Sequence, residues 1–186
     1  SLSARWPLLA VAMVLVAMVI PKAPIEAPDG WRGVQTHWLM TSGQHRLVEQ
    51  HERLVALAEQ VAANDTDRVL IFPETILGQW QLPSSWLWAD AARQAHARGQ
   101  TLVFGAEWPT DGRHYENIAG VMDRHGDLSP IYRQLMPVPF SMWRPWVGEG
   151  ALPAWFDPQT AMIDGRKTTF LICYEHLLIW PPLVAL

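Results

Sequence analysis

The 186-residue sequence predicts an α/β domain preceded by one membrane-spanning helix. Short apolar strands alternate with helical patterns along most of the chain, which is typical of α/β proteins. Hydrophobic residues make up 49% of the sequence and charged residues only 17%, enough apolar material for a buried core. We divide the chain into a transmembrane helix over residues 1–21, a linker over residues 22–30 and an incomplete globular domain over residues 31–186.

The transmembrane helix is predicted from the unbroken apolar run Trp6–Ile20. Extended back to Leu2, this run approaches the ~20 residues that a bilayer requires. Arg5 can then reach the interface with its long side chain, and Pro21 ends the helix. A cleaved signal peptide is the alternative, because Arg5 followed by an apolar stretch fits its early part. The absence of a pair of small residues at cleavage spacing after Ile20 favours the retained helix.

The linker is rich in proline, alanine and acidic residues and is expected to be extended. Alternating and β-branched residues predict a first strand over residues 33–39. Apolar residues at helical spacing predict a helix over residues 44–63. A buried strand is expected over residues 68–72, where Pro73 stops it.

The remaining elements follow from capping and turn residues. Ser84 or Ser85 can begin a helix that runs to Arg98, and Gly99 ends it. Apolar runs predict four further strands, and the turn at residues 124–127 joins two of them as a hairpin. These strands cover residues 101–105, 117–123, 129–135 and 168–172.

Composition excludes several classes of function. The net charge of −4 gives no basic face, so we expect no direct binding to nucleic acid. With one cysteine, neither an internal disulfide nor a cysteine-rich metal site is available. Histidines, carboxylates and the cysteine do not recur at metal-ligand spacing, and no glycine-rich phosphate loop is present. We therefore expect no metal and no cofactor, and we assign structural or solvent roles to the seven histidines.

Glu74 is the first candidate for chemistry. It follows the buried strand over residues 68–72, behind Pro73, which places a carboxylate at the rim of the sheet. Partial desolvation there would raise its pKa and suit it to proton transfer. The alternative is a helix-capping or solvated acid in a turn.

Cys173 is the second candidate, at the end of the apolar string Phe170–Ile172. A thiol that leaves a buried strand into a turn is well placed for nucleophilic attack. It needs a neighbouring base or a positive field to form the thiolate. Glu74 is a candidate for that base. The alternative is a small buried hydrophobic residue.

Three strings together resemble the carbon–nitrogen hydrolase, or nitrilase, superfamily. Ile71–Thr75 resembles its general-base signature and Ile172–Glu175 resembles its nucleophile signature. Val138–Phe140 resembles a Val-Pro-Phe string that lies between the two. The resemblance covers residues 31–180. Two membrane-bound branches are known, the apolipoprotein N-acyltransferases and the conjugal transfer protein TraB group, and Met136–Trp146 is more similar to the second.

The resemblance implies a layered α-β-β-α sandwich that is truncated on its C-terminal side. It implies Cys173 as nucleophile and Glu74 as acid/base partner. The family places a lysine before Val138, but this chain has none there. An ungapped alignment puts Gln134 at that position, and a shift of one residue puts Arg133 there, so both are catalytic candidates. The candidates for substrate binding are Tyr174, Trp143 and Glu175.

By the same resemblance, the protein is expected to be a Cys-dependent amidohydrolase or N-acyltransferase that acts through a thioacyl-enzyme. Its location would be the bacterial inner membrane, with a periplasmic domain. Expected partners are membrane lipid, a small-molecule, lipid or peptide acyl substrate, and conjugation-machinery proteins. The alternative is a catalytically silent module that docks within a conjugation or envelope assembly, which the missing lysine favours.

Overall fold

The computed structural model describes residues 26–36, 46–64, 66–157 and 159–185. The predicted transmembrane helix over residues 1–21 lies outside these ranges. Across the described part of the chain, no helix has both the length and the apolar character needed to cross a membrane.

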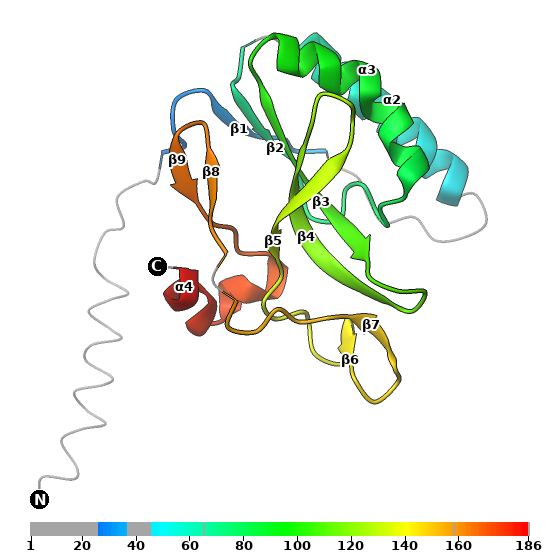
Figure 1. The fold of residues 1–186 in the computed structure, drawn as a ribbon, viewed down its shortest axis with the longest axis vertical. Helices are drawn as coiled ribbons and strands as arrows, with labels where there is room; N and C mark the ends of the chain where they lie inside the picture. The colour runs from blue at the N-terminus through cyan, green and yellow to red at the C-terminus, as the bar shows by residue number, and fades with distance from the viewer. Residues whose placement is uncertain (1–25, 37–45, 65, 158, 186) are drawn as a thin grey trace, which may run out of the picture.

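The described elements alternate as expected for an α/β protein and then continue as short strands (Figure 1). In chain order they are β1 (Trp31–Gly33), α2 (Arg46–Ala63), β2 (Val69–Ile71), α3 (Leu82–Ala97), β3 (Thr101–Pro109), β4 (His114–Met122), β5 (Leu128–Arg133), β6 (Trp143–Arg144), β7 (Glu149–Ala151), β8 (Ala161–Ile163), β9 (Arg166–Thr168), the 3₁₀ helix η2 (Cys173–Leu177) and α4 (Trp180–Ala185).

The main sheet has the strand order β1-β2-β3-β4-β7-β6, and β5 also pairs with β4. β1, β2 and β3 run parallel, and the connections between them contain α2 and α3, as parallel neighbours require. β4 and β5 follow as antiparallel neighbours, which confirms the predicted hairpin. Asp123 closes its turn by accepting hydrogen bonds from the backbone N–H groups of His125 and Asp127.

Helices α2 and α3 lie side by side over one face of the sheet (Figure 1). Successive strand residues point to opposite faces, so Leu102 and Phe104 on β3 face the helices. Trp88 of α3 is fully buried against Phe104, with ring centroids 4.8 Å apart. Phe72 stacks on the same ring at 4.2 Å. This core holds the end of β2 in place, immediately before Glu74.

The opposite face of the sheet packs a second cluster around Val103 and Ala119. Ile163 of β8 and Ile172 cover these residues from the C-terminal part of the chain. The hairpin of β8 and β9 forms a separate two-stranded sheet on this side (Figure 1). The α/β class is therefore confirmed, with one main sheet between two helices and a C-terminal layer.

The predicted last strand over residues 168–172 is wrong. β9 ends at Thr168, and the segment that follows has no strand partner. The reason lies in the backbone of Ile172, whose N–H donates to the Glu175 carboxylate and whose carbonyl accepts from the Gln134 side chain. The N–H and the carbonyl of Ile172 are thus bonded to side chains and are not available for pairing with another strand. The predicted strand over residues 33–39 is also displaced, because β1 ends at Gly33; residues 37–39 lie outside the described part.

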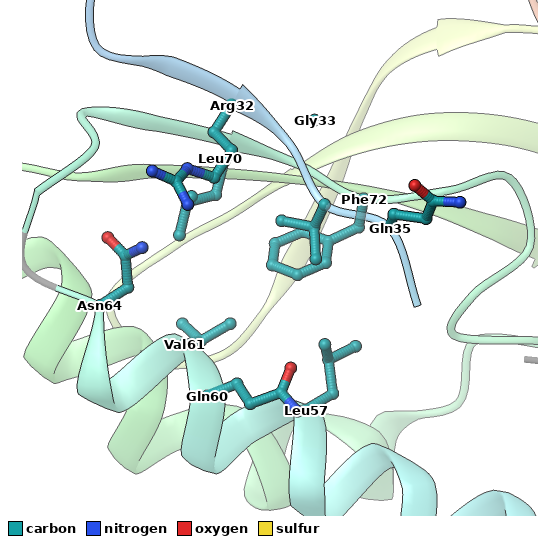
Figure 2. Close-up of a pocket in the computed structure, with 10 residues that line it drawn as sticks. Arg32, Gly33, Gln35, Leu57, Gln60, Val61, Asn64, Leu70 and Phe72 are labelled. Atoms are coloured by element: carbon teal, nitrogen blue, oxygen red, sulfur yellow. The ribbon is translucent and has the colours of Figure 1, made fainter. Parts of the chain in front are cut away.

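A cavity of about 280 Å³ lies between β1 and α2 (Figure 2). Leu57, Val61 and Phe72 form its apolar wall. Among its polar residues, Arg32 forms an ion pair with Asp67 at 2.7 Å. Among the described residues, those that line this cavity include no cysteine, histidine or carboxylate.

Candidate active site

The loop after β2 presents Glu74 at the edge of the sheet. The backbone N–H of Phe72 still bonds to Val103, and the chain then turns at Pro73 and at Thr75, whose φ is 50°. Gly105 of β3 lies directly beneath this loop. A Cβ at Gly105 would come within 2.6 Å of the Glu74 Cα, so only glycine lets the loop approach the sheet this closely.

Two buried amides connect Glu74 to the nucleophile segment. Asn117 of β4 donates from Nδ2 to Glu74 Oε1 at 2.6 Å and to Gln134 Oε1 at 3.1 Å. Gln134 in turn donates from Nε2 to the carbonyl of Ile172 at 3.0 Å. Both amide side chains are fully buried. The chain of hydrogen bonds therefore runs from Glu74 to the residue immediately before Cys173.

Cys173 opens η2 in a left-handed backbone conformation, with φ at 50°. Its thiol lies near the Glu74 carboxylate, because both residues line the same cavity and the charge of Glu74 acts on the sulfur. Burial, followed by the negative charge of Glu74, raises the pKa of the Cys173 thiol. The backbone N–H of Tyr174 acts in the opposite direction by bonding to the sulfur. The resting pair is thus a thiol that faces a carboxylate.

Glu175 fixes the turn that carries Cys173. Its side chain is completely buried and accepts four hydrogen bonds, which satisfy both carboxylate oxygens. The donors are the Tyr132 hydroxyl and the backbone N–H groups of Leu135, Met136 and Ile172, at 2.9, 2.5, 3.3 and 2.6 Å. Desolvation nevertheless raises the pKa of Glu175. These hydrogen bonds give Glu175 a positioning role in the turn that carries Cys173, and its contact with substrate stays a prediction.

A second cavity of about 280 Å³ opens at the pair of Glu74 and Cys173. Its wall is apolar apart from Glu74, Cys173 and His176. Such a cavity holds a small acyl group or a short side chain, with the sulfur exposed at its wall.

The two candidates for the lysine position have different surroundings. Gln134 lies inside the hydrogen-bond chain described above. Arg133, its neighbour on β5, is partly exposed and pairs with Glu116 at 2.9 Å. Adjacent residues of an extended chain face opposite ways, so Gln134 is linked to Glu74 through Asn117, whereas Arg133 lies outside this cluster.

The two aromatic candidates for substrate binding lie in different places. Trp143 of β6 packs edge-to-face against Trp155, with centroids 5.3 Å apart, and does not line the cavity of Glu74 and Cys173. Tyr174 follows Cys173 directly and is half-buried. The backbone N–H of Tyr174 interacts with the sulfur of Cys173.

Two residues of this site were missed from sequence. The sequence predicts Asn117 only as the first residue of a strand, and His176 only as a structural or solvent histidine. The available signal for Asn117 was an amide in the otherwise apolar string that continues to Met122, since a buried amide needs partners. The available signal for His176 was its position three residues after Cys173, nearer than any other histidine.

The fold defines a class of protein. The chain is similar to a carbon–nitrogen hydrolase from Helicobacter pylori G27, with a TM-score of 0.50 and 13% identity over 69% of this chain and 47% of that one. The described residues thus have a carbon–nitrogen hydrolase fold, as the sequence motifs predicted. No protein-family model matches the sequence.

In sequence, the chain is similar to a conjugal transfer protein, TraB. It is 35% identical over 159 residues to "Conjugal transfer protein TraB" of Agrobacterium fabrum (strain C58 / ATCC 33970), covering 83% of this chain and 36% of that protein. It is 31% identical over 161 residues to "Probable conjugal transfer protein TraB" of Sinorhizobium fredii (strain NBRC 101917 / NGR234), covering 84% and 40%. The predicted resemblance is confirmed, and the chain spans less than half the length of these two relatives.

Proposed function

We propose that this chain carries a thiol-dependent carbon–nitrogen hydrolase or acyl-transfer site, with Cys173 as nucleophile and Glu74 as its acid/base partner. One observation carries the proposal: Cys173 and Glu74 lie together at the wall of an apolar cavity, where the charge of Glu74 acts on the thiol. A nucleophile beside a base, whose carboxylate is held by a third group, is the arrangement that covalent catalysis uses. Asn117 is that third group.

The reaction begins when Cys173 attacks the carbonyl carbon of an amide. The sulfur–carbon bond forms, the thiol proton passes to Glu74, and the carbonyl electron pair moves onto oxygen. Collapse of this intermediate breaks the carbon–nitrogen bond, and the departing nitrogen takes the proton from Glu74. Water or an amine then attacks the thioacyl-enzyme, and Glu74 again receives and returns one proton, which restores the thiol.

The hydrogen bonds around Glu74 and Cys173 suit this cycle. Asn117 holds one carboxylate oxygen of Glu74 in place while the carboxylate gains and loses a proton. Gln134 holds the carbonyl of Ile172, and Glu175 holds its N–H, so the turn before the sulfur is held from both sides. Preorganised groups of this kind reduce the rearrangement needed in the transition state.

Acyl labelling tests the pair directly, because Cys173 is the one cysteine of the chain. An activated acyl donor should add one acyl group, which mass spectrometry of the intact protein detects. Glu74→Gln should slow labelling by roughly a factor of 10² or more, the contribution typical of a general base. Glu52→Gln, on the exposed surface of α2, is the matched control. Equal labelling rates in Glu74→Gln and the unmodified chain would remove Glu74 from the mechanism.

The second candidate function is a silent docking module with the same fold. Two observations favour it: Gln134, which the ungapped alignment puts at the lysine position, is neutral and has both ends of its amide engaged, and the Cys173 pKa is raised instead of lowered. Alkylation at neutral pH separates the two functions. A catalytic thiol should react faster in the folded protein than in the denatured chain, whereas a silent thiol should react more slowly.

The proposal extends to the whole protein as a membrane-anchored, TraB-type component of conjugal transfer. Its support is the apolar run Trp6–Ile20 and the similarity to two TraB proteins. The domain would complete a layered α-β-β-α sandwich and face the periplasm from the bacterial inner membrane. Acyl substrates, membrane lipid and conjugation-machinery proteins would be its partners. An alkaline phosphatase fusion after residue 186 tests the orientation, because this enzyme is active only on the periplasmic side.

A further inference from the structure

Among the described residues that line the cavity at Cys173, His176 is the one whose side chain can carry a positive charge. The lining of this cavity consists of apolar residues and Gly105 together with Glu74, Cys173 and His176. A reaction that places negative charge on a carbonyl oxygen needs a donor close to that oxygen. The charged partners available in the lining are therefore one carboxylate and one imidazole.

The geometry of η2 places His176 beside the sulfur. This element runs from Cys173 to Leu177 as a 3₁₀ helix. A 3₁₀ helix has three residues per turn, so side chains at positions i and i+3 lie on the same face. Cys173 and His176 have this spacing, and both line the cavity and are exposed. Glu175, between them in sequence, points into the protein and is fully buried.

Neither candidate for the lysine position supplies a cation to the oxyanion. Gln134 is neutral, and both ends of its amide are hydrogen-bonded to Asn117 and to the carbonyl of Ile172. Arg133 pairs with Glu116 on the other face of β5. Within the described ranges, neither arginine nor lysine lines this cavity.

We propose that His176 is a further catalytic residue, whose imidazolium form donates a hydrogen bond to the oxyanion when Cys173 attacks. This inference rests on the proposed function and adds the cation that the lysine position lacks. The sulfur–carbon bond forms, the thiol proton goes to Glu74, and the electron pair on oxygen is held by the imidazolium N–H. His176 keeps its proton throughout, and the departing nitrogen receives its proton from Glu74.

Several groups set the field around His176. Glu74 faces it from the loop after β2, and Cys173 faces it from its own element. Glu175 lies behind η2, where Tyr132 donates to it.

Three further groups interact electrostatically on the Glu74 side of the site: Tyr115, Glu107 and Arg144. The pKa of the Tyr115 hydroxyl is raised by burial and by the charges of Glu107 and Glu74, while Arg144 acts to lower it. Glu107 is the register partner of Asn117 across β3 and β4. Neither Glu107 nor Arg144 lines the cavity at Cys173.

The test compares two alkylating reagents that differ by one charge. Iodoacetate is an anion and iodoacetamide is neutral, but both react with the same Cys173 thiolate. The fraction of Cys173 present as thiolate therefore drops out of the ratio of the two rates, and this ratio reports the charge close to the sulfur. An adjacent imidazolium at a solvent-exposed position should favour iodoacetate by about threefold, and salt should reduce this preference. Because histidine side chains titrate between about pH 5 and 8, the rates are measured at pH ~5.5 and ~8.5 on the full chain.

Three variants define the outcome. The unmodified chain should favour iodoacetate at the lower pH and lose that preference at the higher pH. His176→Gln should lack the preference at both, and His176→Lys should keep it at both, because an ammonium stays charged. His125→Gln, in the exposed turn between β4 and β5, should behave as the unmodified chain does. Circular dichroism checks that each variant is folded.

An unchanged ratio in His176→Gln at the lower pH, or a ratio that does not vary with pH in the unmodified chain, overturns the role of His176. Loss of the preference in His125→Gln would overturn it as well. The proposed function is judged separately, by whether Glu74→Gln slows acyl labelling of Cys173. A chain that needs Glu74 but shows no effect of His176 would refute this inference and leave the proposed function standing.

Discussion

Replacing Glu175 by glutamine should destabilise the fold and release the nucleophile turn. The side chain is fully buried, and its two oxygens accept hydrogen bonds from four donors. Glutamine keeps the size of the side chain but converts one oxygen into an NH₂ donor. When the amide oxygen faces Leu135 and Met136, the NH₂ group meets the Tyr132 hydroxyl, which can rotate to accept, and the Ile172 N–H, which cannot.

The magnitude follows from those contacts. A buried N–H without a partner costs about 1–3 kcal/mol, and two charge-assisted bonds become neutral bonds that are each weaker by about 1 kcal/mol. Removing a desolvated charge offsets part of this loss. We expect Glu175→Gln to lower the free energy of unfolding by about 2–4 kcal/mol. Glu175→Ala should cost more, because all four donors lose their partner and a cavity is left.

The pH dependence of stability provides a second test of Glu175→Gln. The pKa of Glu175 is raised in the folded state, mainly by desolvation. The folded state therefore holds its proton to higher pH than the unfolded chain, and the contribution of this group to stability falls as pH rises from the unfolded pKa, about 4.3, through the folded pKa. Glu175→Gln should lose this slope, whereas Glu52→Gln on the exposed face of α2 should retain it.

Urea unfolding followed by tryptophan fluorescence measures both effects, since the chain has eleven tryptophans. Acyl labelling of Cys173 in the folded variant should also slow, because the N–H of Ile172 no longer fixes the turn before the sulfur. A variant within about 0.5 kcal/mol of the unmodified chain, with the same pH slope, would refute the reasoning, because a change of that size is ordinary for surface positions.

Three further predictions concern the groups that hold Glu74. Gly105→Ala should lower stability by about 1–3 kcal/mol and slow labelling of Cys173, because the new methyl group displaces the loop that carries Glu74; urea unfolding and mass spectrometry check this. Asn117→Asp removes the donor to Glu74 and adds a like charge, so labelling at neutral pH should fall by about tenfold or more; an unchanged rate would contradict the hydrogen-bond chain. Gln134→Lys should lower the Cys173 pKa and speed alkylation by about tenfold per pKa unit, because a buried ammonium would meet the unpartnered Asn117 Oδ1; slower alkylation in a folded variant would count against it.

The parts of the fold that follow from local pattern were predicted from the sequence. α2, α3 and the pair of β4 and β5 lie within a few residues of their expected positions, because helical periodicity and the turn at residues 124–127 define them. The four short strands β6 to β9 were not foreseen at their observed positions. Each is two or three residues long, so periodicity has too few positions to act on.

Part of the candidate site could likewise be predicted from the sequence, and part could not. Glu74 and Cys173 could be predicted because each follows an apolar string, and the family motifs contain both. The choice between Gln134 and Arg133 could not be made, since one residue of register decides which side chain faces Glu74. The burial of Glu175 could not be predicted, because a carboxylate in a turn gives no sign that four donors, three of them from residues 132–136, will surround it.

The backbone at Cys173 has a consequence for related sequences. Its left-handed conformation disfavours every residue that carries a Cβ, by about 1–2 kcal/mol, and glycine alone adopts it without cost. Replacing Cys173 by glycine would thus stabilise the folded state. Once selection for thiol chemistry ends, drift at position 173 should favour glycine, so the residue found there distinguishes relatives that still use the chemistry from those that have given it up.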